Sequence, residues 1–295
     1  MNSTKWRKPG QPEFVAPGSP EHRATISPSK IAAILGISRF QSQYTCWMDM
    51  AGRLPVIESD VTPEVFKVGH AFEHALAHLW KEDNPGWRLS RQGVQVETDQ
   101  FGFPAVCTLD RLASRGRSRR VVEFKTARDL SQWGDEGGDE APSDYLVQVQ
   151  AQMLLTGITK YPGHLMVMGP FFKRFNYVID YDPQIAEWML GKCRDFYQSI
   201  LSNTPPVLDD STSTYSTVRA MHPDIVDGKV VEVAEALWVD LAAANRQSKE
   251  SDKLLRGLKA QLLDVVGDAQ TATVNGEVVA TRRPSTKGSV ALVLK

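Results

Sequence analysis

The run VVEFKT at positions 121–126 constrains this chain more than any other stretch. Its composition and alternation are typical of a short buried β-strand. On such a strand Glu123 and Lys125 project to the same face, because successive side chains alternate. A carboxylate and an ammonium group are costly to bury on an apolar strand unless they pair or bind a metal ion. This strand is therefore predicted to carry a functional site.

A second carboxylate precedes the strand. Asp110 ends an apolar run at positions 103–109, and a basic turn at 115–120 separates that run from the strand. If the two runs pair as a hairpin, Asp110 and Glu123 approach closely enough to share a divalent cation, with Lys125 beside them. The alternative interpretation is a structural ion pair at a sheet edge.

Turn-rich segments divide the 295 residues into four predicted parts. Residues 1–20, rich in Pro and Gly, are predicted to be an irregular arm. Residues 21–208 form the predicted domain around the site, and the polar residues 209–228 a linker. Residues 229–295 are predicted to be a long helix followed by a hairpin with an Asn-Gly turn. The apolar stripe of that helix favours subunit assembly or docking of a partner protein.

Composition narrows the class of protein. The chain is 42% hydrophobic and 23% charged, which is typical of a globular protein. It has no apolar run of about 18 residues, so no membrane span is expected. The first ten residues lack the apolar core of a signal peptide, so residence in the cytoplasm is expected.

The cysteines and the net charge say little more about the class of protein. The three cysteines, at positions 46, 107 and 193, form neither a zinc pattern nor a disulfide framework. The formal net charge is −1, yet five arginines lie between Arg111 and Arg120, which favours a local contact with phosphate groups or a solvated hairpin tip.

Three histidines share one face of a helix predicted from about residue 62. His70, His74 and His78 are spaced by four residues, a spacing that can chelate zinc. No cysteine or carboxylate completes such a site, so a packed or solvated helix face is the favoured interpretation. Glu73 lies on the same helix.

Five motifs, in this order, resemble those of the YqaJ viral recombinase family, relatives of phage lambda exonuclease among the PD-(D/E)XK nucleases. The motifs lie at Ser29–Gly36, Gly69-x-x-x-Glu73, Asp110, Glu123-x-Lys125, and Tyr145-x-x-Gln148-x-Gln150 with Thr156-Gly157. The resemblance covers about residues 26–208. It implies an α/β fold of restriction-endonuclease type, with a mixed central sheet flanked by helices. The predicted C-terminal helix and β-hairpin lie outside the resemblance and form an extension of this fold.

The resemblance also implies an activity. Members are metal-dependent exonucleases that degrade one strand of linear double-stranded DNA from its 5′ end. They pass the 3′ single strand to an annealing protein for phage-type recombination in the host cytoplasm, and several form toroidal trimers. The implied cofactor is Mg²⁺, with Mn²⁺ as an alternative. Two other functions stay open: a structure-specific or restriction-type endonuclease of the same fold, and a catalytically silent protein that binds DNA ends.

Roles for individual residues follow from the resemblance. The implied metal ligands are Asp110, Glu123, the backbone carbonyl of Phe124 and, at an outer position, Glu73. Lys125 is implied to orient or deprotonate the attacking water, with its pKa lowered by the metal. Gln148 is implied to hydrogen-bond this water or the phosphate.

A small pocket for a 5′ phosphate is implied as well. Its predicted residues are Ser29, Thr108 and Arg23. Thr108 stands where the family usually has serine, and Arg23 lies one residue closer to Ser29 than the family spacing. The residues flanking Asp110, Leu109 and Arg111, also depart from the family's usual Pro and Gly, which bears on the turn geometry there.

Overall fold

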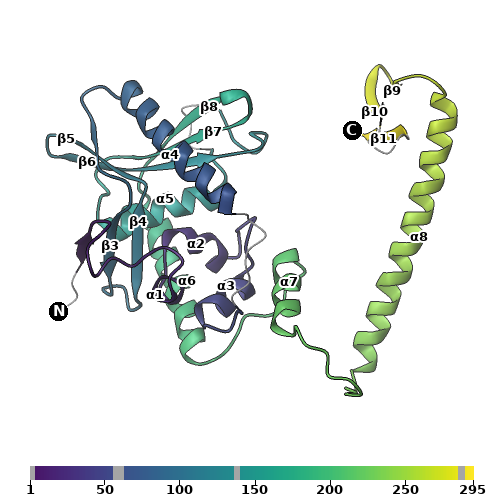
Figure 1. The fold of residues 1–295 in the computed structure, drawn as a ribbon, viewed down its shortest axis with the longest axis horizontal. Helices are drawn as coiled ribbons and strands as arrows, with labels where there is room; N and C mark the ends of the chain where they lie inside the picture. The colour runs from purple at the N-terminus through teal and green to yellow at the C-terminus, as the bar shows by residue number, and fades with distance from the viewer. Residues whose placement is uncertain (1–3, 56–62, 136–139, 285–289) are drawn as a thin grey trace. The chain divides into compact units, whose positions relative to one another are not determined.

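The computed structural model describes residues 4–55, 63–135, 140–284 and 290–295. The chain divides into two compact units, residues 1–225 and 226–295. In Figure 1 the first unit runs from purple to green and contains the central sheet, whereas the second contains a long helix and a small sheet. All the predicted site residues belong to the first unit.

The central sheet has five strands and mixed direction. Their order is β2 (Arg88–Leu89), β5 (Arg111–Arg115), β6 (Ser118–Thr126), β7 (Gly163–Met168) and β8 (Arg174–Ile179). β6 and β7 are parallel, and the other neighbouring pairs are antiparallel. Helices flank this sheet, so the predicted α/β fold with a mixed central sheet is confirmed.

A second sheet is formed by strands that precede Asp110 in the sequence. Its strands, in order, are β1 (Lys5–Arg7), β3 (Val94–Thr98) and β4 (Ala105–Leu109), and both pairings are antiparallel. β1 lies within the segment predicted to be an irregular arm. That arm is therefore in part a strand that pairs with β3.

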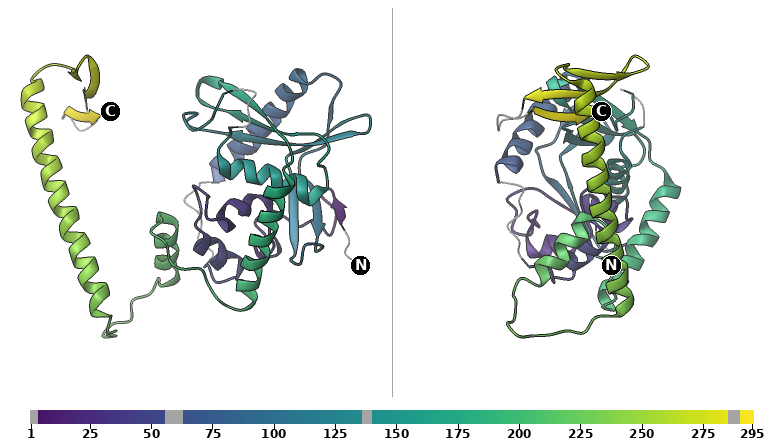
Figure 2. Two further views of the ribbon diagram at one scale, coloured as in Figure 1. Left: turned by 180° about the vertical axis from the view of Figure 1, so that it is seen from behind. Right: turned by 90° about the vertical axis from the view of Figure 1, so that its right-hand side faces the viewer.

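The long helices α4 (Pro63–Asp83) and α5 (Ser143–Thr156) cover opposite faces of the central sheet (Figures 1 and 2). The helices of the first unit are α1 (Pro20–Ala24), α2 (Pro28–Ile34), α3 (Gln43–Met50), α4 (Pro63–Asp83), α5 (Ser143–Thr156), α6 (Pro183–Leu201) and α7 (Thr212–Met221), with a short 3₁₀ turn η1 (Pro170–Phe172). Val122 and Phe124 on β6 belong to the buried cluster that includes Trp80 of α4. Val121 belongs to the other cluster, together with Met153 of α5. Because side chains alternate, Glu123 and Lys125 lie on the α5 face of β6.

The helix that faces the site has well-defined ends. α5 begins after Pro142 and ends at Gly157, which has a positive φ of 68°. Glycine adopts this left-handed conformation without a steric penalty, so it terminates the helix. The helix therefore spans Ser143–Thr156 and is followed directly by Gly157.

The segment predicted to be a linker, residues 209–228, contains α7. The hydroxyl of Ser211 accepts a hydrogen bond from the backbone N–H of Thr214 and so caps the helix. Thr214 is buried and donates to Ser42 Oγ at 2.7 Å, and Thr217 Oγ1 lies 2.8 Å from Thr45 Oγ1. The linker prediction is wrong for this helix, because its threonines form buried hydrogen bonds with α3.

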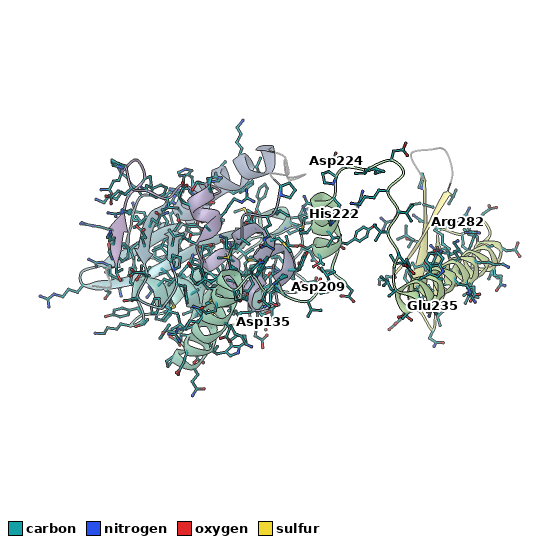
Figure 3. All side chains as sticks on the ribbon, turned by 90° about the horizontal axis from the view of Figure 1, so that it is seen from below. Asp135, Asp209, His222, Asp224, Glu235 and Arg282 are labelled. Carbon is teal, nitrogen blue, oxygen red and sulfur yellow. The ribbon has the colours of Figure 1, made fainter. Side chains whose placement is uncertain are left out.

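The second unit consists of α8 (Glu235–Val266) and three strands, β9 (Thr271–Val274), β10 (Glu277–Pro284) and β11 (Val290–Leu294). Asn275 and Gly276, with φ of 51° and 85°, form the predicted two-residue turn between β9 and β10. β11 pairs with β10 and extends the predicted hairpin to a three-stranded sheet. Arg282, labelled in Figure 3, donates to the carbonyl of Gly267 at the end of α8.

α8 has an unusual surface for so long a helix. None of its residues is buried, and leucines at positions 237, 241, 255 and 258 are between 44% and 63% exposed. Within the described part of the chain, no helix is both long and apolar enough to cross a membrane.

Candidate active site

Asp110 lies where the chain passes from one sheet to the other. β4 ends at Leu109 in the three-stranded sheet, and β5 begins at Arg111 in the central sheet. β5, and not the 103–109 run, pairs with β6, with Arg111 opposite Val122. The predicted hairpin partner was therefore wrong. The expected closeness of Asp110 to the end of β6 nevertheless results, because Asp110 directly precedes β5.

A hydrogen bond connects Asp110 to β6. Its Oδ2 accepts from the backbone N–H of Phe124 at 2.8 Å. Burial raises the pKa of Asp110 well above its usual value, and the negative charge of Glu123 raises it further. The structure thus brings Asp110 and Glu123 together in a poorly solvated place.

Glu123 is 3% exposed and accepts three side-chain hydrogen bonds. Its Oε1 accepts from Lys125 Nζ at 2.6 Å and from Gln148 Nε2 at 2.5 Å. Its Oε2 accepts from Gln152 Nε2 at 2.6 Å. A buried carboxylate is stable only when it is paired and hydrogen-bonded, and these contacts meet that condition. They also fix the orientation of Glu123.

Gln152 was not among the predicted site residues. It follows Gln148 by four positions, so both side chains project from the same face of α5. That spacing was present in the sequence and identifies Gln152. The motif instead included Gln150, which donates to the carbonyl of Asp180 at 2.6 Å and accepts from the N–H of Asp182 at 3.1 Å. Gln150 therefore connects α5 to the start of α6.

Lys125 lies between the site and an aromatic ring. Its Nζ is 5.1 Å from the centre of the Tyr145 ring, close enough for a cation–π contact. Burial lowers the pKa of Lys125, but the carboxylates of Glu123 and Asp110 outweigh this effect and raise the pKa. That direction is opposite to the expected one, which included the charge of a metal ion.

Glu73 approaches from α4, on the other face of the sheet. The amide of Gln92 donates to its carboxylate. Burial raises the pKa of Glu73, while His70 lowers it and Glu123 raises it again. Within the described residues Glu73 forms no hydrogen bond with Asp110 or Glu123. The structure thus places it near the two carboxylates without contact.

The three residues predicted to bind a 5′ phosphate have separate partners. Arg23 Nε donates to Asp49 Oδ1 at 2.7 Å. Ser29 Oγ lies 3.1 Å from Ser27 Oγ, and Thr108 Oγ1 accepts from Gln95 Nε2 at 3.0 Å. Among the described residues no hydrogen bond links these three to one another, so their shared role stays a prediction.

The histidine stripe on α4 has other contacts. His78 Nε2 lies 3.2 Å from Glu82 Oε1 on the same helix. His74 Nδ1 lies 3.4 Å from the guanidinium of Arg111. In the part of the chain that the structure describes, no group of three or more His, Cys, Asp or Glu residues is arranged to hold a metal ion.

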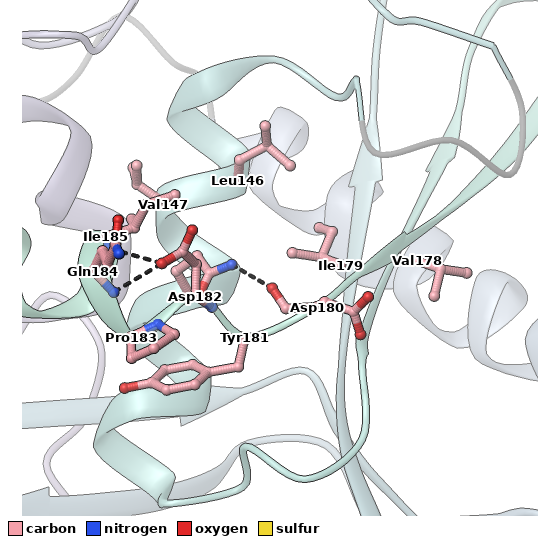
Figure 4. Close-up of a pocket in the computed structure, with 11 residues that line it drawn as sticks. Leu146, Val147, Val178, Ile179, Asp180, Tyr181, Asp182, Pro183, Gln184 and Ile185 are labelled. Carbon is pink, nitrogen blue, oxygen red and sulfur yellow. Dashed lines mark hydrogen bonds between the residues drawn. The ribbon is translucent and has the colours of Figure 1, made fainter.

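Two of the surface cavities on the first unit are lined in part by α5. One, of about 630 Å³, begins directly after Lys125, and Thr126, Arg128, Arg39, Phe40 and Tyr145 are among its lining residues. The other, of about 580 Å³, lies between α5, β8 and the start of α6 and contains no predicted site residue (Figure 4). The first cavity is open to a substrate beside Lys125.

The donor atoms around Glu123 fit a hard divalent cation. Asp110, Glu123 and the Phe124 carbonyl offer oxygen atoms only, and Mg²⁺ is commonly held by one or two carboxylates together with water and substrate phosphate. Burial and mutual repulsion disfavour ionisation of Asp110, and a divalent cation would offset both effects. Glu73, which forms no hydrogen bond with either carboxylate in the described residues, stays the predicted ligand at an outer position.

The sequence matches known proteins over most of its length. A model of the YqaJ-like viral recombinase domain matches residues 19–159, which include Asp110, Glu123, Lys125 and Gln148. The uncharacterized protein YqaJ of Bacillus subtilis (strain 168) is 24% identical over 239 residues, which are 80% of this chain and 70% of that protein.

Solved structures with a similar arrangement share little sequence. SSO0001 is 15% identical with a TM-score of 0.39, over 70% of this chain and 88% of its own. The alkaline exonuclease LHK-Exo from Laribacter hongkongensis is 12% identical, with a TM-score of 0.46 over 61% of this chain and 90% of its own. The structure of LHK-Exo in complex with dAMP is also 12% identical, with a TM-score of 0.49 over 63% of this chain and 92% of its own. Residues 19–159 of this chain are thus similar to the YqaJ-like viral recombinase domain, and the wider chain is similar to the Bacillus subtilis protein.

Proposed function

We propose that this protein is a Mg²⁺-dependent deoxyribonuclease that degrades one strand of linear double-stranded DNA from its 5′ end. The supporting observation is the buried carboxylate of Glu123, held by Lys125, Gln148 and Gln152 beside Asp110. This arrangement lies within the YqaJ-like viral recombinase domain.

Phosphodiester hydrolysis needs positive charge at the reacting phosphate, because the negative phosphate repels a hydroxide nucleophile. When bound at Asp110, Glu123 and the Phe124 carbonyl, Mg²⁺, or Mn²⁺ in its place, supplies that charge and makes water more acidic. Gln148 and Gln152 keep the Glu123 oxygens in place. Such positioning by neighbouring side chains typically matters as much as the ligands themselves.

Lys125 supplies the second positive group. Its side chain is 22% exposed, and Nζ lies 2.6 Å from Glu123 Oε1. From that place it would donate a hydrogen bond to the attacking water or to a phosphate oxygen. Gln148, which is half-buried, would contact the same water or phosphate. The cavity after Lys125 would hold the neighbouring nucleotides.

The direction of cleavage would depend on recognition of the 5′ phosphate. Ser29, Thr108 and Arg23 are the proposed residues, and Arg23 would exchange its contact with Asp49 for the phosphate. The remaining 3′ single strand would pass to an annealing protein during phage-type recombination in the host cytoplasm. A ring of three subunits is the proposed assembly. The family description as a viral recombinase supports this role.

Digestion of defined DNA substrates tests the proposal. Linear duplexes with 5′-phosphate or 5′-hydroxyl ends and closed circular duplex would be incubated with Mg²⁺ or with EDTA. Wild type would be compared with Lys125→Ala and with Lys160→Ala, a control at an exposed lysine outside the site. Wild type and Lys160→Ala should shorten linear DNA from 5′-phosphate ends with Mg²⁺, and Lys125→Ala should be at least about 100-fold slower.

The other outcomes separate the alternatives. Nicking of circular DNA would indicate an endonuclease of the same fold. Binding of DNA ends without cleavage under any of these conditions would indicate a catalytically silent protein. Activity that survives both EDTA and Lys125→Ala would refute the mechanism.

A further inference from the structure

The turn between β7 and β8 exposes two adjacent phenylalanine rings. Phe171 is 99% exposed and Phe172 is 79% exposed. Single exposed apolar residues are ordinary on protein surfaces, but two neighbouring aromatic rings almost wholly in water are not. These residues belong neither to the buried clusters nor to the candidate active site.

The backbone of this turn is also unusual. Phe171 and Phe172 have φ of 57° and 61°, in the left-handed region that bulky side chains disfavour. Two hydrogen bonds close the turn: the N–H of Gly169 donates to Lys173 O at 2.8 Å, and the N–H of Lys173 donates to Pro170 O at 3.2 Å. The closed turn therefore holds both rings in a strained, exposed conformation. Strain of this kind is concentrated at functional sites.

The turn projects from the same sheet edge at which β6 ends. β7 is parallel to β6, with Lys125 opposite Val167 and Thr126 opposite Met168. The N–H of Ala127 then donates to Met168 O at 2.9 Å, one residue before the turn begins. Because parallel strands end at the same edge, the aromatic turn after β7 lies beside the end of β6, the strand that carries Glu123 and Lys125.

The loop after β6 packs directly against this turn. A Cβ atom at Gly169 would lie 2.5 Å from the side chain of Leu130, so a larger residue there would force Leu130 to move. The contact holds the turn beside the 630 Å³ cavity, because residues 126–129 line that cavity. The position of the two rings relative to the site is therefore built into the packing.

The charged side chains around the rings favour a polyanion. Lys173 and Arg128, on the two packed segments, are both exposed. Asp129, next to Arg128, is acidic, and its carboxylate accepts hydrogen bonds from the N–H and the hydroxyl of Ser131. Exposed aromatic rings with cationic neighbours are the combination by which proteins bind single-stranded nucleic acid, because rings stack on bases and cations contact phosphates.

We propose that Phe171 and Phe172 stack on unpaired bases at a frayed DNA end and so align the strand whose phosphate reaches Glu123 and Lys125. The inference rests on the proposed nuclease function. It adds a base-stacking site outside the metal and phosphate groups. The rings would act as positioning residues, since they touch bases and not the reacting phosphate.

Equilibrium binding in EDTA tests this inference apart from cleavage. Fluorescence anisotropy would report the affinity for a labelled duplex with a frayed end and for a closed hairpin duplex without one. The variants would be F171A/F172A, F171L/F172L and F171Y/F172Y. Trp188→Ala, at a half-exposed aromatic residue on α6, would be the matched control.

Loss of stacking should weaken binding of the frayed end at least about fivefold in the Ala and Leu variants, the effect of a single stacked base. The Tyr variant should bind like wild type, as should Trp188→Ala. The closed duplex should be bound equally by all. Each variant should unfold at about the temperature of wild type, because the substituted rings contribute little buried area.

Three results would overturn the inference. Unchanged affinity in the Ala variant would show that the rings do not contact DNA. Full affinity in the Leu variant would show apolar contact without stacking. A changed sedimentation coefficient in the variants would assign the rings to an interface between copies of the chain. If wild type binds frayed ends through the rings but cleaves no linear DNA with Mg²⁺, the nuclease proposal fails and the stacking site does not.

Discussion

Replacement of Gln152 by leucine separates an active site from a structural ion pair. Gln152 is 1% exposed, and its Nε2 donates to Glu123 Oε2 at 2.6 Å. Lys125 and Gln148 both hold the other oxygen, Oε1. Among the described residues Gln152 is thus the one hydrogen-bond donor to Oε2, and without it Glu123 is held only through Oε1.

The size of the effect follows from this geometry. A hydrogen bond to a charged group contributes about 1.5–3 kcal/mol, which corresponds to roughly 10- to 150-fold. Loss of a residue that orients a metal ligand typically reduces metal affinity or activity about 10- to 100-fold. Gln152→Leu should therefore lower DNA cleavage about 10- to 100-fold at fixed Mg²⁺, and additional Mg²⁺ should restore part of it. The assay is cleavage rate as a function of Mg²⁺ concentration.

Stability should change little in this variant. Gln152 Oε1 is buried and has no hydrogen-bond partner in the described structure, so leucine removes an unsatisfied acceptor together with the lost donor. Gln150→Leu is the matched control, because Gln150 is also buried on α5 but binds Asp180 and Asp182. It should lower the melting temperature without changing the Mg²⁺ dependence. Equal Mg²⁺ dependence in both variants would refute the role of Gln152.

Two further predictions concern stability and domain structure. Burial and the nearby Arg120 lower the pKa of His164 from its usual 6.5 to about 4, so protonation favours the unfolded chain between these values. The contribution of His164 to the free energy of unfolding should be constant above pH 6.5. It should fall by about 3 kcal/mol as the pH is lowered from 6.5 to 4. Urea denaturation should show this loss in wild type and not in His164→Gln; identical slopes would contradict it. Deletion of residues 229–295 should leave the first unit folded, because its core clusters lie between Ile26 and Met221, while subunit assembly or partner binding is impaired. Thermal denaturation and sedimentation check this, and an unfolded or wholly unchanged truncate would count against it.

The periodicity of strands and the residue preferences of turns were sufficient to predict part of the structure from the sequence. Side-chain alternation along β6 placed Glu123 and Lys125 on one face, and the structure joins them at 2.6 Å. The resemblance predicted a role for Gln148, and helical spacing puts Gln152 on the same face of α5. The Asn275-Gly276 turn was also predicted from local preference alone.

The pairing of strands was not a local property. The 103–109 run is apolar, whereas residues 111–115 include two arginines and a serine, so the sequence favoured the first as the partner of β6. The structure assigns the first to β3 and the second to β6. Burial of each strand against other segments decides between such partners, and those segments are distant in sequence.

The sequence by itself determined which residues share a face, where α5 ends, and that a carboxylate and a lysine must be buried together. Only the tertiary structure decided that Asp110 lies at the crossing between two sheets, that Arg23 pairs with Asp49, and that Phe171 and Phe172 stand exposed at the edge where β6 ends. The physical reason is that backbone periodicity sets the direction of a side chain, whereas its partner depends on how distant segments pack.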